Sequence, residues 1–288
     1  MTTAVIGATG RVGREIVRGA LARGDAVAAL VRDPGKARRV FGDPGRLHIR
    51  ATRLDDPRDL AGALDGIRSV FIAMGSTGTE GVLQRIAISA AAGISSIEQV
   101  TRLSVLNTSA GSLGINQRAH DSIDQFAAAT AVPYSTIRPA IFSASLLAAA
   151  PEVRASRTWT GLAGTGRMAL IDHRDAAEAG LRVLTDPALW GAHHDLTGPV
   201  PLSWPEALEL LSAELGEPVT FQVAAERQFL HRLTSAGIPA GTAELLVTRE
   251  WAILAGENDH TTSTFQQITG RPPRPVAEFL HEYRAEFA

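Results

Sequence analysis

The chain of 288 residues contains no cysteine. A protein without thiols forms no disulfides, holds no zinc through thiolates and has no thiol nucleophile. No apolar segment approaches the ~20 residues of a membrane-spanning helix, and no charged leader precedes the first apolar run. The formal net charge is −2 without a polybasic run, so nucleic acid is not an expected partner. We expect a cytoplasmic protein.

The sequence does contain a glycine-rich turn near its N-terminus. Residues 4–6 predict a buried strand, residues 15–22 carry apolar side chains at helical spacing, and Gly7, Gly10 and Gly13 stand between them. In a dinucleotide-binding turn, the first glycine permits the tight turn and the second lets the backbone approach a pyrophosphate. The third lets the helix pack on the strand. The N–H groups of the helix N-terminus face the phosphates, so this context predicts a dinucleotide site.

The second predicted strand, residues 26–31, indicates which dinucleotide binds. An acidic residue at its end favours the ribose hydroxyls of NAD, and an arginine accommodates the 2′-phosphate of NADP. Arg32 comes first, and Asp33 follows it directly. A planar guanidinium suits a phosphate, so NADPH is favoured, and Asp33 leaves NADH open as the alternative.

Strands and helices alternate through the first half of the chain. This alternation predicts an α/β fold with a doubly wound parallel sheet, whose ligands bind at the carboxyl ends of the strands. We interpret residues 33–46 as a polar segment rich in glycine and proline, and the chain beyond Gly216 as largely helical. Further strands are predicted at residues 47–51, 69–74, 97–103 and 132–139, and helices from Asp56 onward and over residues 80–92 and 116–129.

Several motifs together resemble the NmrA-like atypical short-chain dehydrogenases/reductases. They are residues 7–13, 31–34, 54–56, 136–139, 171–177, 195–199 and 269–273, with Ser104 and His120. The resemblance implies an NADP-binding Rossmann domain (residues 1–142 and 168–198) and a smaller, mainly helical, discontinuous substrate domain (residues 143–167 and 199–288). The cofactor contacts that it implies are Gly7, Thr9, Gly10, Arg11, Val12, Gly13, Arg32, Leu54, Asp55, Ala73, Met74, Gly75, Pro139 and Phe142.

Scarcity of lysine and tyrosine limits the chemistry. Short-chain reductases usually protonate the product with a tyrosine that has a lysine four positions later. Lys36 is the only lysine here and lies on the adenosine side, and the two tyrosines are Tyr134 and Tyr283. The chain therefore cannot form that pair. Tyr134 has Arg138 four positions later, and we interpret Tyr134 as a packing residue.

Two other residues are the candidates for catalysis. His120 and Asp124 are four positions apart and share a helix face, where a carboxylate would orient or charge an imidazole that titrates near neutral pH. Ser104 ends a predicted strand and would hydrogen-bond a carbonyl oxygen. The alternatives are a helix-surface pair for His120 and a backbone hydrogen bond for Ser104. His173, His193 and His194 are interpreted as structural, and no metal is predicted.

The sequence thus predicts an NADPH-dependent ketoreductase for a polycyclic aromatic substrate, such as a quinone or an aromatic polyketide of antibiotic biosynthesis. Such a substrate shares the negative charge or donates its own proton, so the protein supplies orientation and a dry pocket. The alternatives are a non-catalytic NADP(H) sensor and an NADPH quinone reductase. Residues expected to line the substrate cleft are Met74, Leu113, Asn116, Ile141, Phe142, Leu146, Trp159 and Leu162.

Overall fold

A seven-stranded sheet forms the centre of the computed structural model, which describes residues 2–75 and 78–288. Its order is β3-β2-β1-β4-β5-β6-β9, and every neighbouring pair is parallel. This confirms the predicted doubly wound sheet. The order reverses between β1 and β4, where such sheets open a crevice for ligands. The strands are β1 (Thr2–Ile6), β2 (Ala26–Val31), β3 (Leu47–Ala51), β4 (Ser69–Ile72), β5 (Gln99–Leu103), β6 (Tyr134–Pro139) and β9 (His193–Leu196).

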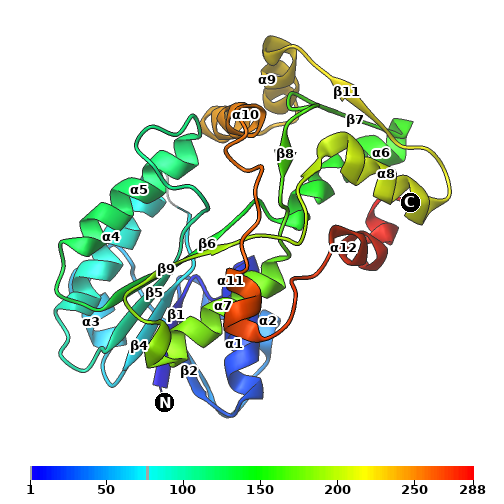
Figure 1. Cartoon of the computed structure of the whole chain (residues 1–288). Coiled ribbons are helices and arrows are strands. Elements are labelled where there is room, and N and C mark those ends of the chain that lie inside the picture. The colour runs from blue at the N-terminus through cyan, green and yellow to red at the C-terminus, as the bar shows by residue number, and fades with distance from the viewer. Residues whose placement is uncertain (1, 76–77) are drawn as a thin grey trace.

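Helices cover both faces of this sheet (Figure 1). One face carries α3 (Pro57–Ala63), α4 (Gly78–Ala92) and α5 (Ile115–Ala128). The other carries α1 (Arg11–Ala22), α2 (Pro34–Phe41), α7 (His173–Thr185) and α11 (Thr264–Thr269). Strands that are buried on both faces read as apolar runs, which is why the sequence revealed them. Among the helices of the described residues, none is both long and apolar enough to cross a membrane.

A second group of helices and short strands lies beyond the carboxyl ends of the sheet (Figure 1). Its core contains Trp159 edge-to-face on Trp204, with ring centroids 4.8 Å apart. How the chain divides into domains stays a prediction. The elements are α6 (Ala150–Ser156), α8 (Trp204–Leu215), α9 (Glu226–Ser235), α10 (Ala240–Leu254), α12 (Val276–Glu282), β7 (Thr158–Gly161), β8 (Arg167–Met168), β10 (Leu202–Ser203), β11 (Thr220–Val223) and the 3₁₀ turns η1 (Ser143–Ala149) and η3 (Arg284–Glu286). A further 3₁₀ turn, η2 (Pro187–Leu189), connects α7 to β9 and packs with the core of the sheet.

Two segments differ from the sequence prediction. Residues 33–46, predicted as a polar segment, contain helix α2, because Asp33 caps it and Pro34 suits its first position. The region after Gly216, predicted as largely helical, begins with strand β11, which pairs in parallel with β7. That pairing joins residues 62 positions apart in the chain, such as Val223 and Gly161, so local periodicity could not reveal it.

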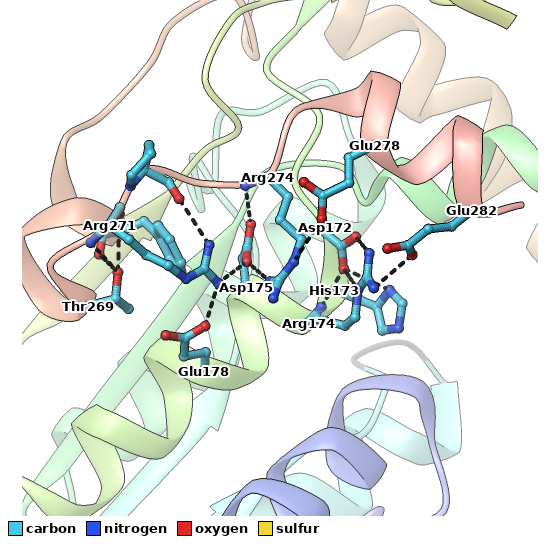
Figure 2. A network of polar contacts seen from close by, with 12 residues as sticks. Asp172, His173, Arg174, Asp175, Glu178, Thr269, Arg271, Arg274, Glu278 and Glu282 are labelled. Carbon is cyan, nitrogen blue, oxygen red and sulfur yellow. Dashed lines mark hydrogen bonds and ion pairs between the residues drawn. The ribbon is translucent and has the colours of Figure 1, made fainter. Parts of the chain in front are cut away.

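An ion network fastens the C-terminal segment to helix α7 (Figure 2). The fully buried carboxylate of Asp175 accepts hydrogen bonds from Arg271 Nη2 at 2.6 Å and from the backbone nitrogen of Arg274 at 2.7 Å. Asp172 caps α7 and pairs with Arg174 at 2.7 Å, and Arg174 reaches Glu282 of α12 at 2.8 Å. The network holds α11 and α12 against the sheet side of the molecule.

The glycine turn after β1 is tight for a geometric reason. Gly7 has φ +80°, and a Cβ placed on it would lie well inside 3.0 Å of the Ala73 carbonyl oxygen. A Cβ on Gly13 would approach the Gly7 carbonyl oxygen as closely. Both glycines therefore perform the roles that the sequence predicted, one at the turn and one where α1 packs on β1.

We expect Gly7→Ala to lower the free energy of unfolding by roughly 2–5 kcal/mol, because it combines left-handed backbone strain with overpacking. Gly24→Ala is the matched control, since Gly24 has φ +79° and nothing lies within 4 Å of its Cβ position. The control should lose only about 1–2 kcal/mol. Urea unfolding measures both losses, and equal losses would contradict the close contact at Ala73.

Candidate active site

A groove of about 300 Å³ lies at the carboxyl ends of β1, β2 and β4. Helix α1 begins there, its N-cap residue Gly10 makes no side-chain capping bond, and its first turn holds no acidic residue. The first N–H groups of a helix have no intrahelical acceptor and suit a phosphate, so the residues present fit the pyrophosphate of NADP(H). The predicted cofactor residues that line the groove are Gly7, Thr9, Gly10, Arg32, Leu54, Ala73, Met74 and Gly75.

Arg32 and Asp33 both line this groove, but they are engaged differently. The Asp33 carboxylate accepts a hydrogen bond of 2.9 Å from the Lys36 backbone nitrogen and so caps α2. This bond lowers the pKa of Asp33 from its usual value. Arg32 also lines the adjoining pocket with Leu54 and Asp55. The acidic group thus caps a helix, while the exposed Arg32 lines both the groove and the adjoining pocket.

A second cavity, of about 380 Å³, adjoins the groove at Met74, which lines both. We call it the inner cavity. Its mostly apolar wall comes from the ends of β5 and β6, from α5 and from α10. A substrate bound there would therefore lie next to the cofactor groove. The predicted residues that line it are Met74, Ser104, Asn116, His120, Pro139, Ile141 and Phe142.

Behind the inner cavity lies a buried charge that the sequence analysis did not identify. Arg102 of β5 is fully buried and forms an ion pair with Asp124 of α5. Its Nε donates to the Tyr134 hydroxyl at 2.6 Å and its Nη2 to Ser104 Oγ at 2.9 Å. These bonds offset the desolvation of the buried pair. The sequence signal that could have identified Arg102 is a charged residue inside an otherwise apolar predicted strand.

His120 contacts the third nitrogen of the Arg102 guanidinium. Arg102 Nη1 lies 2.6 Å from His120 Nδ1. An arginine only donates, so Nδ1 must accept and the imidazole proton lies on Nε2. Burial, together with the positive charges of Arg102 and Arg138, holds the pKa of His120 well below its usual value of 6.5. His120 is therefore a neutral N–H donor at the cavity wall.

The expectation that Asp124 would orient or charge His120 is wrong. Its Oδ1 accepts from the Tyr134 hydroxyl at 2.7 Å, and its Oδ2 accepts from Ser104 Oγ at 3.3 Å and from Arg138 at 3.2 Å. The guanidinium of Arg102 takes the place beside the imidazole that the carboxylate was expected to occupy. Tyr134 is likewise more than a packing residue, and burial raises the pKa of its hydroxyl above the usual value.

The structure does not place every predicted residue at the inner cavity. Trp159 lines a different cavity, together with Arg11, and packs on Trp204. Leu113 is 46% exposed on the loop before α5. Among the cofactor residues, Val12 and Gly13 are buried in the first turn of α1 and can offer backbone only. Leu146 and Leu162 belong to the apolar cores of the second group of helices.

Three other histidines lie close to polar groups away from the inner cavity. His193 Nδ1 lies 2.7 Å from Thr136 Oγ1, and His194 Nε2 lies 2.9 Å from the Leu189 carbonyl oxygen. His173 of α7 lies beside Asp172, with 3.4 Å between Nδ1 and Oδ1. Across residues 2–75 and 78–288, no three His, Cys, Asp or Glu side chains gather as a metal site requires.

Comparisons with known proteins identify relatives that span most of the chain. Residues 7–187 match the model of a family described as NAD(P)H-binding. The NAD(P)H azoreductase of Xenophilus azovorans is 30% identical over 98% of both chains. The NADPH complex of the Escherichia coli quinone oxidoreductase QOR2 superposes with a TM-score of 0.90, at 25% identity, over 97% of this chain and 99% of that one. The regulator NmrA shares the fold, with a TM-score of 0.77 at 17% identity over 99% and 95% of the two chains.

We expect Tyr134→Phe to lower the free energy of unfolding by about 1–3 kcal/mol, because it leaves Arg102 Nε and Asp124 Oδ1 each short of a partner in a buried site. Tyr283→Phe is the matched control, since Tyr283 stacks on Phe279 and phenylalanine preserves that stacking. The control should change stability by less than ~0.5 kcal/mol. Urea unfolding followed by circular dichroism compares them; an unchanged Tyr134→Phe variant would mean that the hydroxyl bonds are not formed.

Proposed function

The chain belongs to the family of NAD(P)H-binding proteins, and on that premise we propose that it reduces quinones with NADPH. The observation that carries the proposal is the neutral His120, held as an N–H donor by Arg102 at the wall of the inner cavity. Azoreductase and quinone oxidoreductase relatives that span nearly the whole chain support an NAD(P)H-dependent oxidoreductase. The sequence predicted a ketoreductase and kept a quinone reductase and a sensor as alternatives.

The protein's contribution to the reaction follows from the two adjoining spaces. When bound in the groove, the reduced nicotinamide supplies a hydride. The quinone takes up that hydride and one solvent proton and becomes a hydroquinone. His120 Nε2–H donates a hydrogen bond to the quinone oxygen on which negative charge develops. The apolar walls around Met74, Ile141 and Phe142 exclude water from that hydrogen bond.

A neutral donor suits a quinone better than an isolated ketone. Hydride transfer to a ketone yields an alkoxide, a strong base that needs a positioned acid. Hydride transfer to a quinone yields a phenolate, whose conjugate acid has a pKa of about 10 in tyrosine, so hydrogen bonding stabilises it until solvent protonates it. Tyr134 does not supply the acid, because its hydroxyl donates to Asp124 on the far side of Arg102.

We propose that Arg32 binds the 2′-phosphate of NADPH, because Asp33 is engaged as the α2 cap. Arg32→Ala should raise the Kd for NADPH about tenfold, or ~1.4 kcal/mol, and leave the Kd for NADH within about twofold. Arg39→Ala is the control, since Arg39 is a largely exposed arginine on α2, the helix that follows Arg32. Calorimetry measures all three proteins. An equal loss for both nucleotides would argue against recognition of the phosphate.

Turnover tests the function itself. Wild type should oxidise NADPH with a naphthoquinone, at a kcat/KM that is flat from about pH 6.5 to about pH 8.5, because His120 is already neutral below that range. His120→Leu should lower kcat about 10²–10³-fold, and His120→Gln, which can still accept from Arg102 and donate into the cavity, should lose less.

Three outcomes would overturn or redirect the proposal. Turnover of a polycyclic ketone but of no quinone would select the ketoreductase of the sequence prediction. Tight NADPH binding without oxidation by any quinone or ketone would select the sensor. A kcat/KM that changes with pH around a midpoint near 6.5, and loses that pH dependence in His120→Gln, would mean that His120 titrates as an acid or base. That result would contradict a His120 that is neutral throughout this range.

A further inference from the structure

Asn258 lies at the inner cavity in the turn that follows α10. It is 1% exposed, and it lines the cavity together with His120. Its side-chain nitrogen is buried without a hydrogen-bond partner in the described part of the chain. Among the described residues that line this cavity, it alone has a side-chain nitrogen in that condition. Such a buried group in a native protein calls for an explanation, and a ligand in the cavity would supply one.

The neighbouring residue fixes this turn in place. The Glu257 carboxylate accepts from Ser112 Oγ at 2.5 Å and from the Leu113 backbone nitrogen at 2.9 Å. Its carbonyl oxygen accepts from the side chain of Asn107, a residue with φ +57°. The Asn258 carbonyl itself accepts from the Ala169 backbone nitrogen at 3.3 Å. The backbone of Asn258 is therefore held at the cavity by its own carbonyl group and by the bonds of the preceding residue.

Two other polar side chains of the cavity wall, those of Ser104 and Arg249, have partners already. Ser104 Oγ bonds Arg102 and Asp124, and the Arg249 guanidinium pairs with Glu250 at 2.8 Å. His120 keeps one donor, the Nε2–H, because Arg102 occupies its other nitrogen. The lining residues thus include His120 on α5, which keeps its Nε2–H, and Asn258 in the turn after α10, whose side-chain nitrogen has no partner among the described residues.

We propose that Asn258 is a substrate-binding residue whose carboxamide N–H binds the second oxygen of a para-quinone while His120 binds the first. The proposal rests on the proposed function and narrows its substrate class. A para-quinone carries two acceptor oxygens at opposite ends of a flat apolar ring and has no donors of its own. An ortho-quinone has both oxygens on one side and reaches only one of the two donors.

The test compares Asn258→Leu with wild type on two quinones. In Asn258→Leu we expect the KM for 1,4-naphthoquinone to rise at least tenfold. The KM for 9,10-phenanthrenequinone should stay within about twofold of the wild-type value. The Kd for NADPH should not change. Because leucine removes a buried unpaired polar group, the variant should also melt about 2 °C higher than wild type. Asp259→Asn, a change to the adjacent exposed residue, should alter none of these values.

Each other outcome counts against Asn258. A lower Tm with equal KM changes for both quinones would show that the side chain supports the fold only, and an unchanged KM for 1,4-naphthoquinone would show that it does not touch the substrate. If wild type turns over no quinone, the proposed function fails separately. Calorimetric binding of 1,4-naphthoquinone to the NADP⁺ complex then decides: at least tenfold weaker binding to Asn258→Leu supports the role, and equal or absent binding overturns it.

Discussion

The buried ion pair of Arg102 and Asp124 determines the chemistry of the site. A charged pair in the interior is stable only when further hydrogen bonds satisfy its remaining donors and acceptors, and here Tyr134, Ser104 and His120 do so. Because the last of these bonds ends on an imidazole nitrogen, the arrangement that neutralises the buried charge also fixes a histidine as neutral. The local structure around Arg102 on β5 and the protonation state of His120 therefore have one cause.

The two adjoining spaces come from different parts of the chain. The groove is a property of the sheet: the Gly7 turn, the uncapped start of α1 and the point where strand order reverses all lie there. The inner cavity requires α10 and the turn at Glu257, which are held by long-range contacts, including the bonds of the Glu257 carboxylate to Ser112 and Leu113. This division separates the binding of the cofactor from the choice of substrate.

The sequence predicted features whose cause is local. The glycine turn and the Asp56 cap of α3 follow from neighbouring residues, and both are found. Strands buried on both faces read as apolar runs, so the sheet was predictable too. The roles of Arg102, Tyr134 and Asn258 were not, because each depends on partners far along the chain. The prediction that Trp159 lines the substrate cleft failed for the same reason. Aromatic residues of a core and of a pocket have the same local sequence pattern.

The central claim is that His120 is a neutral donor with its proton on Nε2. Nuclear magnetic resonance of ¹⁵N-labelled histidine, assigned with His120→Gln, measures both the tautomer and the titration. The account predicts an Nε2–H signal with an unprotonated Nδ1, and no protonation between about pH 8 and about pH 6, where an ordinary histidine with a pKa of ~6.5 would titrate. An Nδ1–H tautomer, or a titration of His120 at or above pH ~6.5, would contradict it.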